Sequence, residues 1–435
     1  MLAVGVAAQR QTPSAKVVRS SDDLQAALNH GGTIELEAGA TFSAARFVVG
    51  KSGTTVRGHA ASLRGTAGPA LYIPPAINDV FISDLSLTSD AADAVVQCGD
   101  NGAAQTRPEQ QPKDITFRNV TIPTHRGRRG FEINCAATIV DSKALDIYAT
   151  TRVDSQALWV GNTCGPVTVI GGEYVAASEN IMVGGDSVKL PCVQTDITFD
   201  GLTLTKPDTW RTDGIPVKNL AEVKAGRNVT LRNLRMGNVW KSAQDGWAFV
   251  ITPKNGLLID GVLIDNVTVD RCGGALQFLG KDYNSVTPAA TRGVVVRNST
   301  FDCRDGKSAR GGRGIFALMS AGVLDVSVEN VTFVGDGNAI VQSDTPAGSP
   351  QGPLTVRNSR MTVGTYGVAA NGSNFGEPLP ASSRYRGREL QAVLEGNVFA
   401  LDGMSATGQK TFKRNFPKNT FVTRAELDAL GAGRK

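Results

Sequence analysis

Charged side chains in the middle of the chain recur at a spacing that could bring them together. In residues 219–224 (NLAEVK), apolar side chains alternate with Glu222 and Lys224. This alternation predicts a strand with both charged groups on its outer face, about 7 Å apart. Lys254 follows Lys224 by 30 residues, and Lys281 follows after another 27. If the chain coils with a period close to 30 residues, these amines stack beside one carboxylate.

A carboxylate beside stacked amines suits β-elimination of a uronate. That reaction needs a positive group beside the sugar carboxylate, a base for the C5 proton and an acid for the leaving oxygen. A lysine crowded by other cations can have a depressed pKa and serve as the base. The alternative is that Glu222 and Lys224 form a solvated ion pair on an exposed face, worth under ~1 kcal/mol.

Other residues are expected to extend this face. Gln277 and Lys281 should contact the same substrate, and Tyr283 should flank it together with Asp186 and Asp282.

A separate basic loop contains Arg126, Arg128 and Arg129. It is a second candidate for holding a polyanion, or it is simply solvated. Trp159 and Trp247 lie near predicted strands, where each either stacks on a sugar ring or belongs to the core.

Composition excludes several function classes. The chain has 435 residues, a net charge of +5 and only three histidines, none at a metal-ligand spacing. Zinc chemistry and a Ser-His-Asp triad are therefore not expected. The mild charge is compatible with an acidic ligand but does not indicate nucleic acid. No apolar run reaches the ~18 residues of a membrane helix.

The elements that position these residues form a repeat. An eight-residue pattern, apolar-x-apolar-x-Asn/Asp/Gly-x-x-apolar, recurs about every 31 residues from Asp84 to Gly396. Each unit predicts two short strands joined at a bend, and a third strand follows it. Three strands per turn predict an all-β, right-handed parallel β-helix of about 12 coils. Bend residues should stack in one column that includes Asn233, Asn266, Asn298 and Asn330.

The two ends of the rod need covers, because an open strand edge invites aggregation. Ser20 opens a short amphipathic helix that Gly31 closes, and Thr423 with Glu426 forms a capping-box pattern. We expect residues 1–15 to be a remnant of an export signal or a disordered terminus, 16–400 to be the β-helix domain, and 401–435 to be a C-terminal cap and basic tail.

Six cysteines fit a secreted or periplasmic protein with up to three disulfides. Cys272 and Cys303 are 31 residues apart, one coil, and we predict that they pair. Cys164 has two candidate partners one coil away, Cys135 and Cys192.

The capping helix, the strand TIELEAGATF and the Asn-bearing coils resemble the pectate-lyase-like superfamily of right-handed parallel β-helix proteins. The resemblance covers about residues 16–400 and implies a sugar groove along the third strands. The Arg-x-Pro-x-x-Arg motif of pectate lyases and the polygalacturonase signatures, taken as a set, are absent.

The Glu-x-Lys at residues 222–224 is similar to that of the superfamily's alginate and chondroitin lyase branch. Carried over, this similarity implies that Lys224 is the base, that Lys254 replaces an arginine, and that Asn219 and Glu222 hold calcium. The branch has Arg-His-Gly where this chain has Lys-Asn-Gly at 254–256, so the match is partial. Lys224→Ala should cost about 10²-fold in kcat while the melting temperature barely moves.

These observations predict an exported carbohydrate-active protein, leaning towards a lyase that cleaves an acidic, uronate-containing polysaccharide. The alternative is a non-catalytic carbohydrate-binding or structural surface protein. The two differ in whether Lys224 and Lys254 converge in a groove with carboxylates or point apart on an open face.

Overall fold

The structure is a computed structural model that describes residues 17–150, 153–282, 291–304, 314–343, 352–370, 382–385 and 388–432. The predicted terminal segment 1–15 and Tyr283 lie outside these ranges.

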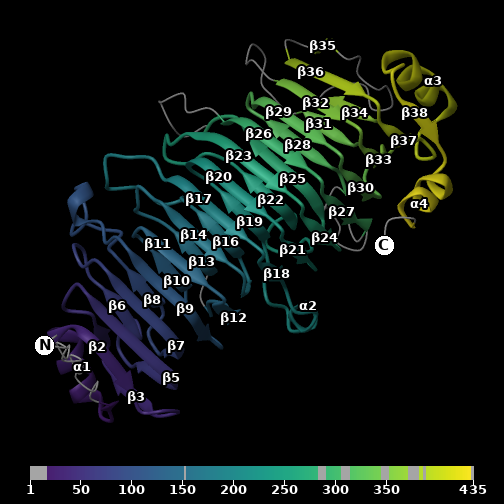
Figure 1. Ribbon diagram of the computed structural model, residues 1–435. Coiled ribbons are helices and arrows are strands. Elements are labelled where there is room, and N and C mark those ends of the chain that lie inside the picture. The colour runs from purple at the N-terminus through teal and green to yellow at the C-terminus, as the bar shows by residue number, and fades with distance from the viewer. Residues whose placement is uncertain are drawn as a thin grey trace, which may run out of the picture.

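The chain winds into a parallel β-helix, as the repeat predicts (Figure 1). Within the described ranges, the third strands form one sheet of 12 strands. We call it the groove sheet. Its strands are β4 (Phe47–Val48), β6 (Leu71–Ile73), β8 (Ala94–Cys98), β10 (Arg129–Ile133), β13 (Gln156–Val160), β16 (Glu179–Val183), β19 (Asn219–Val223), β22 (Trp247–Ile251), β25 (Gly274–Leu279), β28 (Ala317–Ser320), β31 (Val341–Ser343) and β34 (Val368–Ala370).

The eight-residue units form the other sheet, which we call the bend sheet. It has 26 strands in the described part of the chain, and all its pairings are parallel except β35 with β36. Its strands are β1 (Val17–Val18), β2 (Gly32–Leu36), β3 (Thr41–Ala44), β5 (Thr54–Gly65), β7 (Val80–Ser89), β9 (Ile115–Ile122), β11 (Ala137–Val140), β12 (Lys143–Ile147), β14 (Val167–Ile170), β15 (Glu173–Ala176), β17 (Thr195–Asp200), β18 (Thr203–Thr205), β20 (Gly226–Arg232), β21 (Arg235–Gly237), β23 (Ile259–Asp265), β24 (Thr268–Asp270), β26 (Thr291–Arg297), β27 (Thr300–Cys303), β29 (Leu324–Glu329), β30 (Thr332–Gly335), β32 (Gly352–Arg357), β33 (Arg360–Thr362), β35 (Ser382–Tyr385), β36 (Arg388–Glu395), β37 (Val398–Ala400) and β38 (Thr420–Val422).

The bend inside each unit uses a left-handed backbone. Asn233, Asn266, Asn298 and Asn330 all have φ between 51° and 56°. Asparagine tolerates this conformation better than most residues. Strand register aligns the four residues in one column, as predicted. Side-chain amides link neighbouring coils, with Asn266 donating to Asn233 at 2.7 Å and Asn330 donating to Asn298 at 2.9 Å.

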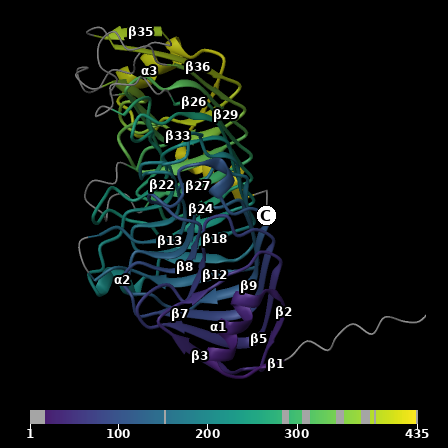
Figure 2. The same cartoon turned by 90° about the vertical axis from the view of Figure 1, so that its left-hand side faces the viewer.

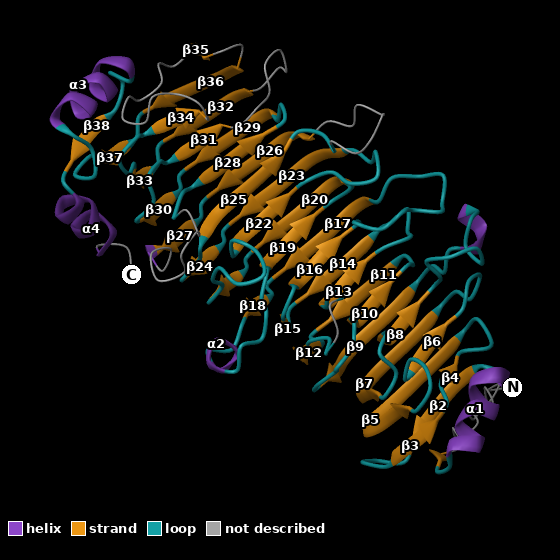
Figure 3. Cartoon of the chain, turned by 180° about the vertical axis from the view of Figure 1, so that it is seen from behind, coloured by secondary structure: helices purple, strands orange, loops and turns teal. Residues whose placement is uncertain are grey.

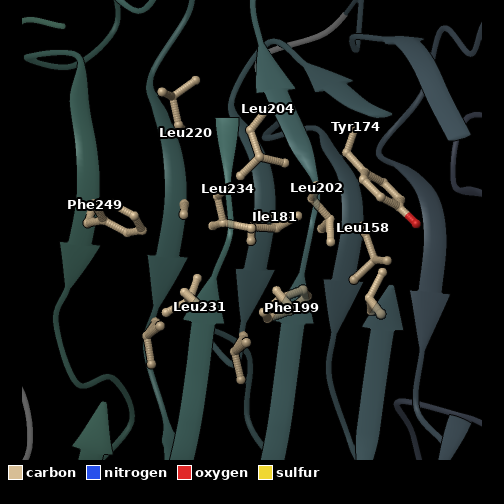
Figure 4. Packing of buried hydrophobic residues seen from close by; sticks show 14 of the residues in the cluster. Leu158, Tyr174, Ile181, Phe199, Leu202, Leu204, Leu220, Leu231, Leu234 and Phe249 are labelled. Atoms are coloured by element: carbon tan, nitrogen blue, oxygen red, sulfur yellow. The ribbon is translucent and has the colours of Figure 1, made fainter. Parts of the chain in front are cut away.

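The core is a column of apolar side chains between the two sheets. Leu158 and Ile181 reach inward from the groove sheet towards Phe199 and Leu231 of the bend sheet (Figure 4). Strand alternation therefore turns the intervening residues of the groove sheet outward, which is how Glu222 comes to lie on its outer face.

Three disulfides tie neighbouring coils. Cys272–Cys303 is present as predicted, and Cys164 pairs with Cys192. The alternative pairing of Cys164 with Cys135 is wrong, because Cys135 bonds to Cys98. The loop after β8 lengthens that coil to 37 residues, so the sequence spacing hid this pair.

Helices lie at both ends of the rod (Figure 3). Helix α1 (Ser21–His30) is capped by the Ser20 hydroxyl and buries Leu24 and Leu28. At the other end, α4 (Arg424–Ala432) begins at the Thr423–Glu426 capping box. Helix α3 (Ala406–Asn415) was not foreseen from the sequence.

A short helix, α2 (Thr209–Thr212), projects from the side of the rod beyond β18 (Figures 1 and 2). No helix in the described ranges combines the length and hydrophobicity needed to cross a bilayer.

The left-handed backbone of the bend column predicts which of two variants at Asn266 is the more stable. Asn266→Val should be less stable than Asn266→Gly by about 1–2 kcal/mol, because a β-branched residue resists the left-handed backbone whereas glycine does not. Urea unfolding followed by circular dichroism measures the difference. Equal midpoints for the two variants would show that the bend does not constrain the coil.

Candidate functional site

A pocket of about 370 Å³ opens on the outer face of the groove sheet, over β19, β22 and β25. We call it the β19–β25 pocket. Its wall combines three carboxylates, two lysines, two amides and several apolar groups: Glu222, Lys224, Gln244, Asp245, Trp247, Val250, Thr252, Pro253, Lys254, Gln277, Leu279 and Asp282. Lys224 and Lys254 thus line one pocket together with carboxylates. This is the arrangement that the sequence analysis expects of a lyase, in contrast to two lysines that point apart on an open face.

Glu222 is held at the floor of this pocket. Its side chain is only 1% exposed, and its carboxylate accepts a hydrogen bond from the Asn219 amide at 2.5 Å. Its other oxygen pairs with the Lys224 ammonium, which is 23% exposed. The pair is therefore not the solvated surface pair of the alternative interpretation, because water reaches only the lysine side.

The Lys224 pKa moves opposite to the expected direction. Burial works to lower it, but the Glu222 carboxylate outweighs burial through its charge and its hydrogen bond, so the pKa is raised. Lys224 therefore keeps its proton at neutral pH. The expectation of a lysine with a depressed pKa is wrong for this residue, because its nearest charged neighbour is an anion rather than another cation.

Lys254 lies one coil further along the rod. Its backbone N–H donates to the carbonyl oxygen of Lys224 at 3.0 Å, so the two residues are direct neighbours on adjacent coils, just beyond the ends of β22 and β19. Its half-buried side chain makes no hydrogen bond or ion pair within the described part of the chain. The Lys254 amine is therefore available to a ligand in the pocket.

Other predicted contact residues divide between the pocket and its surroundings. Gln277 and Asp282 line the pocket, and Asp282 accepts a hydrogen bond from the backbone of Asn255 at 2.9 Å. Lys281 is exposed and does not belong to the pocket wall. Asp186 accepts a hydrogen bond from Asn101 in another loop, at 3.0 Å.

The basic loop does not present three free arginines. Arg129 is buried, pairs with Glu132 at 2.6 Å and stacks over Trp159 with 3.6 Å between its guanidinium carbon and the ring centroid. Arg126 is exposed and pairs with Asp146, whereas Arg128 is half-buried and pairs with Asp93. The prediction that all three bind substrate remains a prediction for Arg126 and Arg128. For Arg129 the geometry indicates a structural role.

A buried carboxyl missed by the sequence analysis lies next to the pocket. Glu179 is 1% exposed and accepts a hydrogen bond from Gln156 at 2.7 Å. Burial and the nearby Glu222 charge raise its pKa to about 8. Glu179 begins a strand and is followed by the polar Asn180. Apolar and charged residues do not alternate there, so the sequence pattern did not mark Glu179 as a site residue.

Lys206 is a buried cation close to Glu179, and its amine contacts the turn between β15 and β16. Burial lowers its pKa to about 7, and its amine donates to three carbonyl oxygens and to Asn180, at distances from 2.7 to 3.1 Å. These bonds hold the turn that precedes β16 and so support the groove sheet from within.

The residues proposed for calcium do not fit that ion. Calcium takes six to eight oxygen ligands. Here the Lys224 ammonium occupies one face of Glu222, and the Asn219 oxygen already accepts from the Trp247 backbone at 3.0 Å. Among the described residues, no three His, Cys, Asp or Glu side chains gather as a metal-binding group.

Comparison with known proteins supports the fold. No protein-family model and no curated protein sequence matches the chain. Among solved structures, the catalytic unit of a thermostable GH87 α-1,3-glucanase from Streptomyces thermodiastaticus strain HF3-3 is similar at a TM-score of 0.51 and 15% identity, over 93% of this chain and 72% of that one.

Two further solved structures show weaker similarity. The catalytic domain of a GH87 α-1,3-glucanase bound to tetrasaccharides has a TM-score of 0.49 at 13% identity, over 90% of this chain and 70% of that one. An alginate lyase from Paenibacillus sp. str. FPU-7 has a TM-score of 0.38 at 15% identity, over 90% and 98%. At 15% identity, the similarity to the glucanase unit with a TM-score of 0.51 concerns the fold alone.

Glu179 should make stability depend on pH. The folded chain keeps this proton up to a pKa of about 8, whereas an unfolded chain loses it near 4.5. The unfolded state thus binds fewer protons between these values, and stability falls as pH rises through the window. Glu179→Gln should therefore stabilise the protein more at pH 8 than at pH 5, by up to about 3 kcal/mol.

Urea midpoints at both pH values measure this effect, with the exposed Glu329→Gln as the control. If Glu179→Gln and the control shift equally at the two pH values, Glu179 does not hold a proton in the folded state.

Removing Lys224 alone should destabilise the fold, contrary to the sequence-based expectation of an unmoved melting temperature. Lys224→Met leaves the Glu222 carboxylate buried without its cation, at a cost of about 3 kcal/mol. The double variant Glu222→Gln/Lys224→Met should recover most of this loss in thermal unfolding. No recovery would mean that the two groups are not coupled.

Proposed function

We propose that the chain is an exported enzyme that cleaves an acidic, uronate-containing polysaccharide by β-elimination in the β19–β25 pocket. The observation that carries the proposal is the convergence of Lys224 and Lys254 with carboxylates in one pocket. If Glu222 and Lys224 were only a surface ion pair, there would be no reason for Lys254, a lysine without a partner among the described residues, to lie beside them.

The two lysines take roles that follow from their partners. Lys254 has no partner within the described residues, so its amine is free to bind the uronate carboxylate and to stabilise the charge that develops there. Lys224 stays protonated because its pKa is raised, and Glu222 holds it in place, so it has a proton to give to the more basic alkoxide oxygen that leaves. The family resemblance implies that Lys224 is the base, so the proposal changes the role of Lys224 from base to acid and leaves Lys254 as the cation in place of the arginine.

The overall reaction balances without an added redox partner. The C5–H bond of the uronate breaks and its electron pair forms the C4–C5 double bond. The C4–O bond breaks in turn, and the departing oxygen takes a proton. The product is an unsaturated uronate at the new end of the polymer.

The fold comparison and the disulfides support the broader part of the proposal. The glucanase with a TM-score of 0.51 acts on a polysaccharide, as its name states. Three disulfides with no free cysteine among the described residues favour an oxidising compartment, such as the periplasm or the exterior. A non-catalytic carbohydrate-binding protein is the alternative that the assay must separate.

Activity is tested by screening uronate polymers for the ultraviolet absorbance of the unsaturated product, with new reducing ends measured in parallel. Reducing ends without the absorbance would indicate hydrolysis and contradict β-elimination. Binding without either signal on any uronate polymer would favour the non-catalytic alternative.

Lys254→Ala should lower kcat by about 10²-fold or more, because it removes the cation beside the substrate carboxylate. Its fold should be unaffected, since the Lys254 side chain has no partner in the described structure. Lys143→Ala, an exposed lysine on β12 of the bend sheet, is the matched control. An unchanged rate for Lys254→Ala would remove Lys254 from the mechanism.

A further inference from the structure

We propose that Asp245 is the base that removes the C5 proton. This inference rests on the proposed β-elimination and supplies the one group that the two lysines leave unassigned. Asp245 lies on the turn before β22, and its half-buried side chain lines the β19–β25 pocket.

Asp245 is set apart by its lack of partners. Glu222 is engaged by Asn219 and Lys224, and Asp282 accepts the backbone N–H of Asn255. The Asp245 carboxylate makes no hydrogen bond or ion pair with any described residue. A base must have a free lone pair directed at substrate, and among the pocket's carboxylates Asp245 meets this requirement best.

The backbone holds Asp245 at a fixed place. Gly246 follows it with a φ of +75°, and a Cβ at that position would lie 2.5 Å from the Trp240 carbonyl carbon. Gly246 also accepts the backbone N–H of Gly273 at 3.0 Å, which ties the turn to the next coil. The carboxylate is therefore presented from a turn that has little freedom to shift.

Gln244 connects this turn to the floor of the pocket. Its side-chain oxygen accepts a hydrogen bond from the Asn219 amide at 2.6 Å, and the same amide holds Glu222. Asp245 thus sits beside the network that fixes Lys224, while Lys254 lies in the same pocket on the turn after β22. An acid, a base and a cation are brought together around one space.

The step is then complete in its bonds and protons. Asp245 takes the C5 proton, and the C5–H electron pair becomes the C4–C5 double bond. Lys224 gives its proton to the leaving oxygen as the C4–O bond breaks. Lys254 neutralises the uronate carboxylate throughout. The enzyme is reset when Asp245 gives its proton to solvent and Lys224 takes one from solvent.

The test is the steady-state kinetics of Asp245→Asn on the uronate polymer that the parent protein cleaves best. We expect kcat to fall by about 10²–10⁴-fold with KM little changed, because the amide keeps the shape but cannot accept the proton. Formate added to Asp245→Ala should restore part of the rate.

Asp213→Asn, an exposed carboxylate on the loop that follows α2, is the control for charge alone. If the parent protein is active and Asp245→Asn retains its rate, Asp245 is not the base and the proposed lyase function stands. If the parent protein makes no unsaturated product from any uronate polymer, the lyase function itself fails.

Discussion

Each coil turns at a residue held in the left-handed backbone conformation, and the position of that residue decides which side chains face the core. With Asn266 at the bend, Ile264 and Val267 both reach the interior. Because side chains alternate along a strand, a shift of one residue would expose the apolar column and bury the charges. Parallel pairing then places the same set of side chains inward in each successive coil. The bend column and the disulfides hold the strand register.

The pocket is a consequence of that register. Glu222 pairs across the groove sheet with Met182 on one side and Val250 on the other, so a carboxylate stands between two apolar neighbours. Burying it is unfavourable unless it is paired and hydrogen-bonded. Asn219 and Lys224 meet both requirements. The same low-exposure setting makes the site's electrostatic interactions stronger than they would be on an open face of the rod.

The sequence predicted what depends on local periodicity and missed what depends on loops. The repeat gave the coils, the bend column and the outward placement of Glu222 and Lys224, because strand alternation and a constant period determine them. The Cys98–Cys135 disulfide was missed because the loop after β8 does not follow the repeat. The burial of Arg129 was missed because it depends on side-chain contacts with Glu132 on β10 and Trp159 on β13, which the spacing of residues does not show.

The candidate site shows the same division. The direction of the Lys224 pKa depends on how deeply Glu222 is buried, and spacing alone could not reveal that depth. Asp245 lies in a turn between repeats, where neither strand alternation nor coil period assigns a direction to a side chain. Asp245 differs from Glu222 and Asp282 in its lack of side-chain partners among the described residues, which only the three-dimensional structure shows.

If the proposed mechanism is correct, a uronate chain lies in the β19–β25 pocket with one carboxylate against Lys254. A crystal structure of Asp245→Asn with a bound uronate oligosaccharide would show this arrangement. We expect a sugar carboxylate within hydrogen-bond distance of the Lys254 amine, and the C5 carbon facing residue 245. An oligosaccharide bound on another face of the rod, or seated in the pocket with its carboxylates turned away from Lys254, would rule the mechanism out.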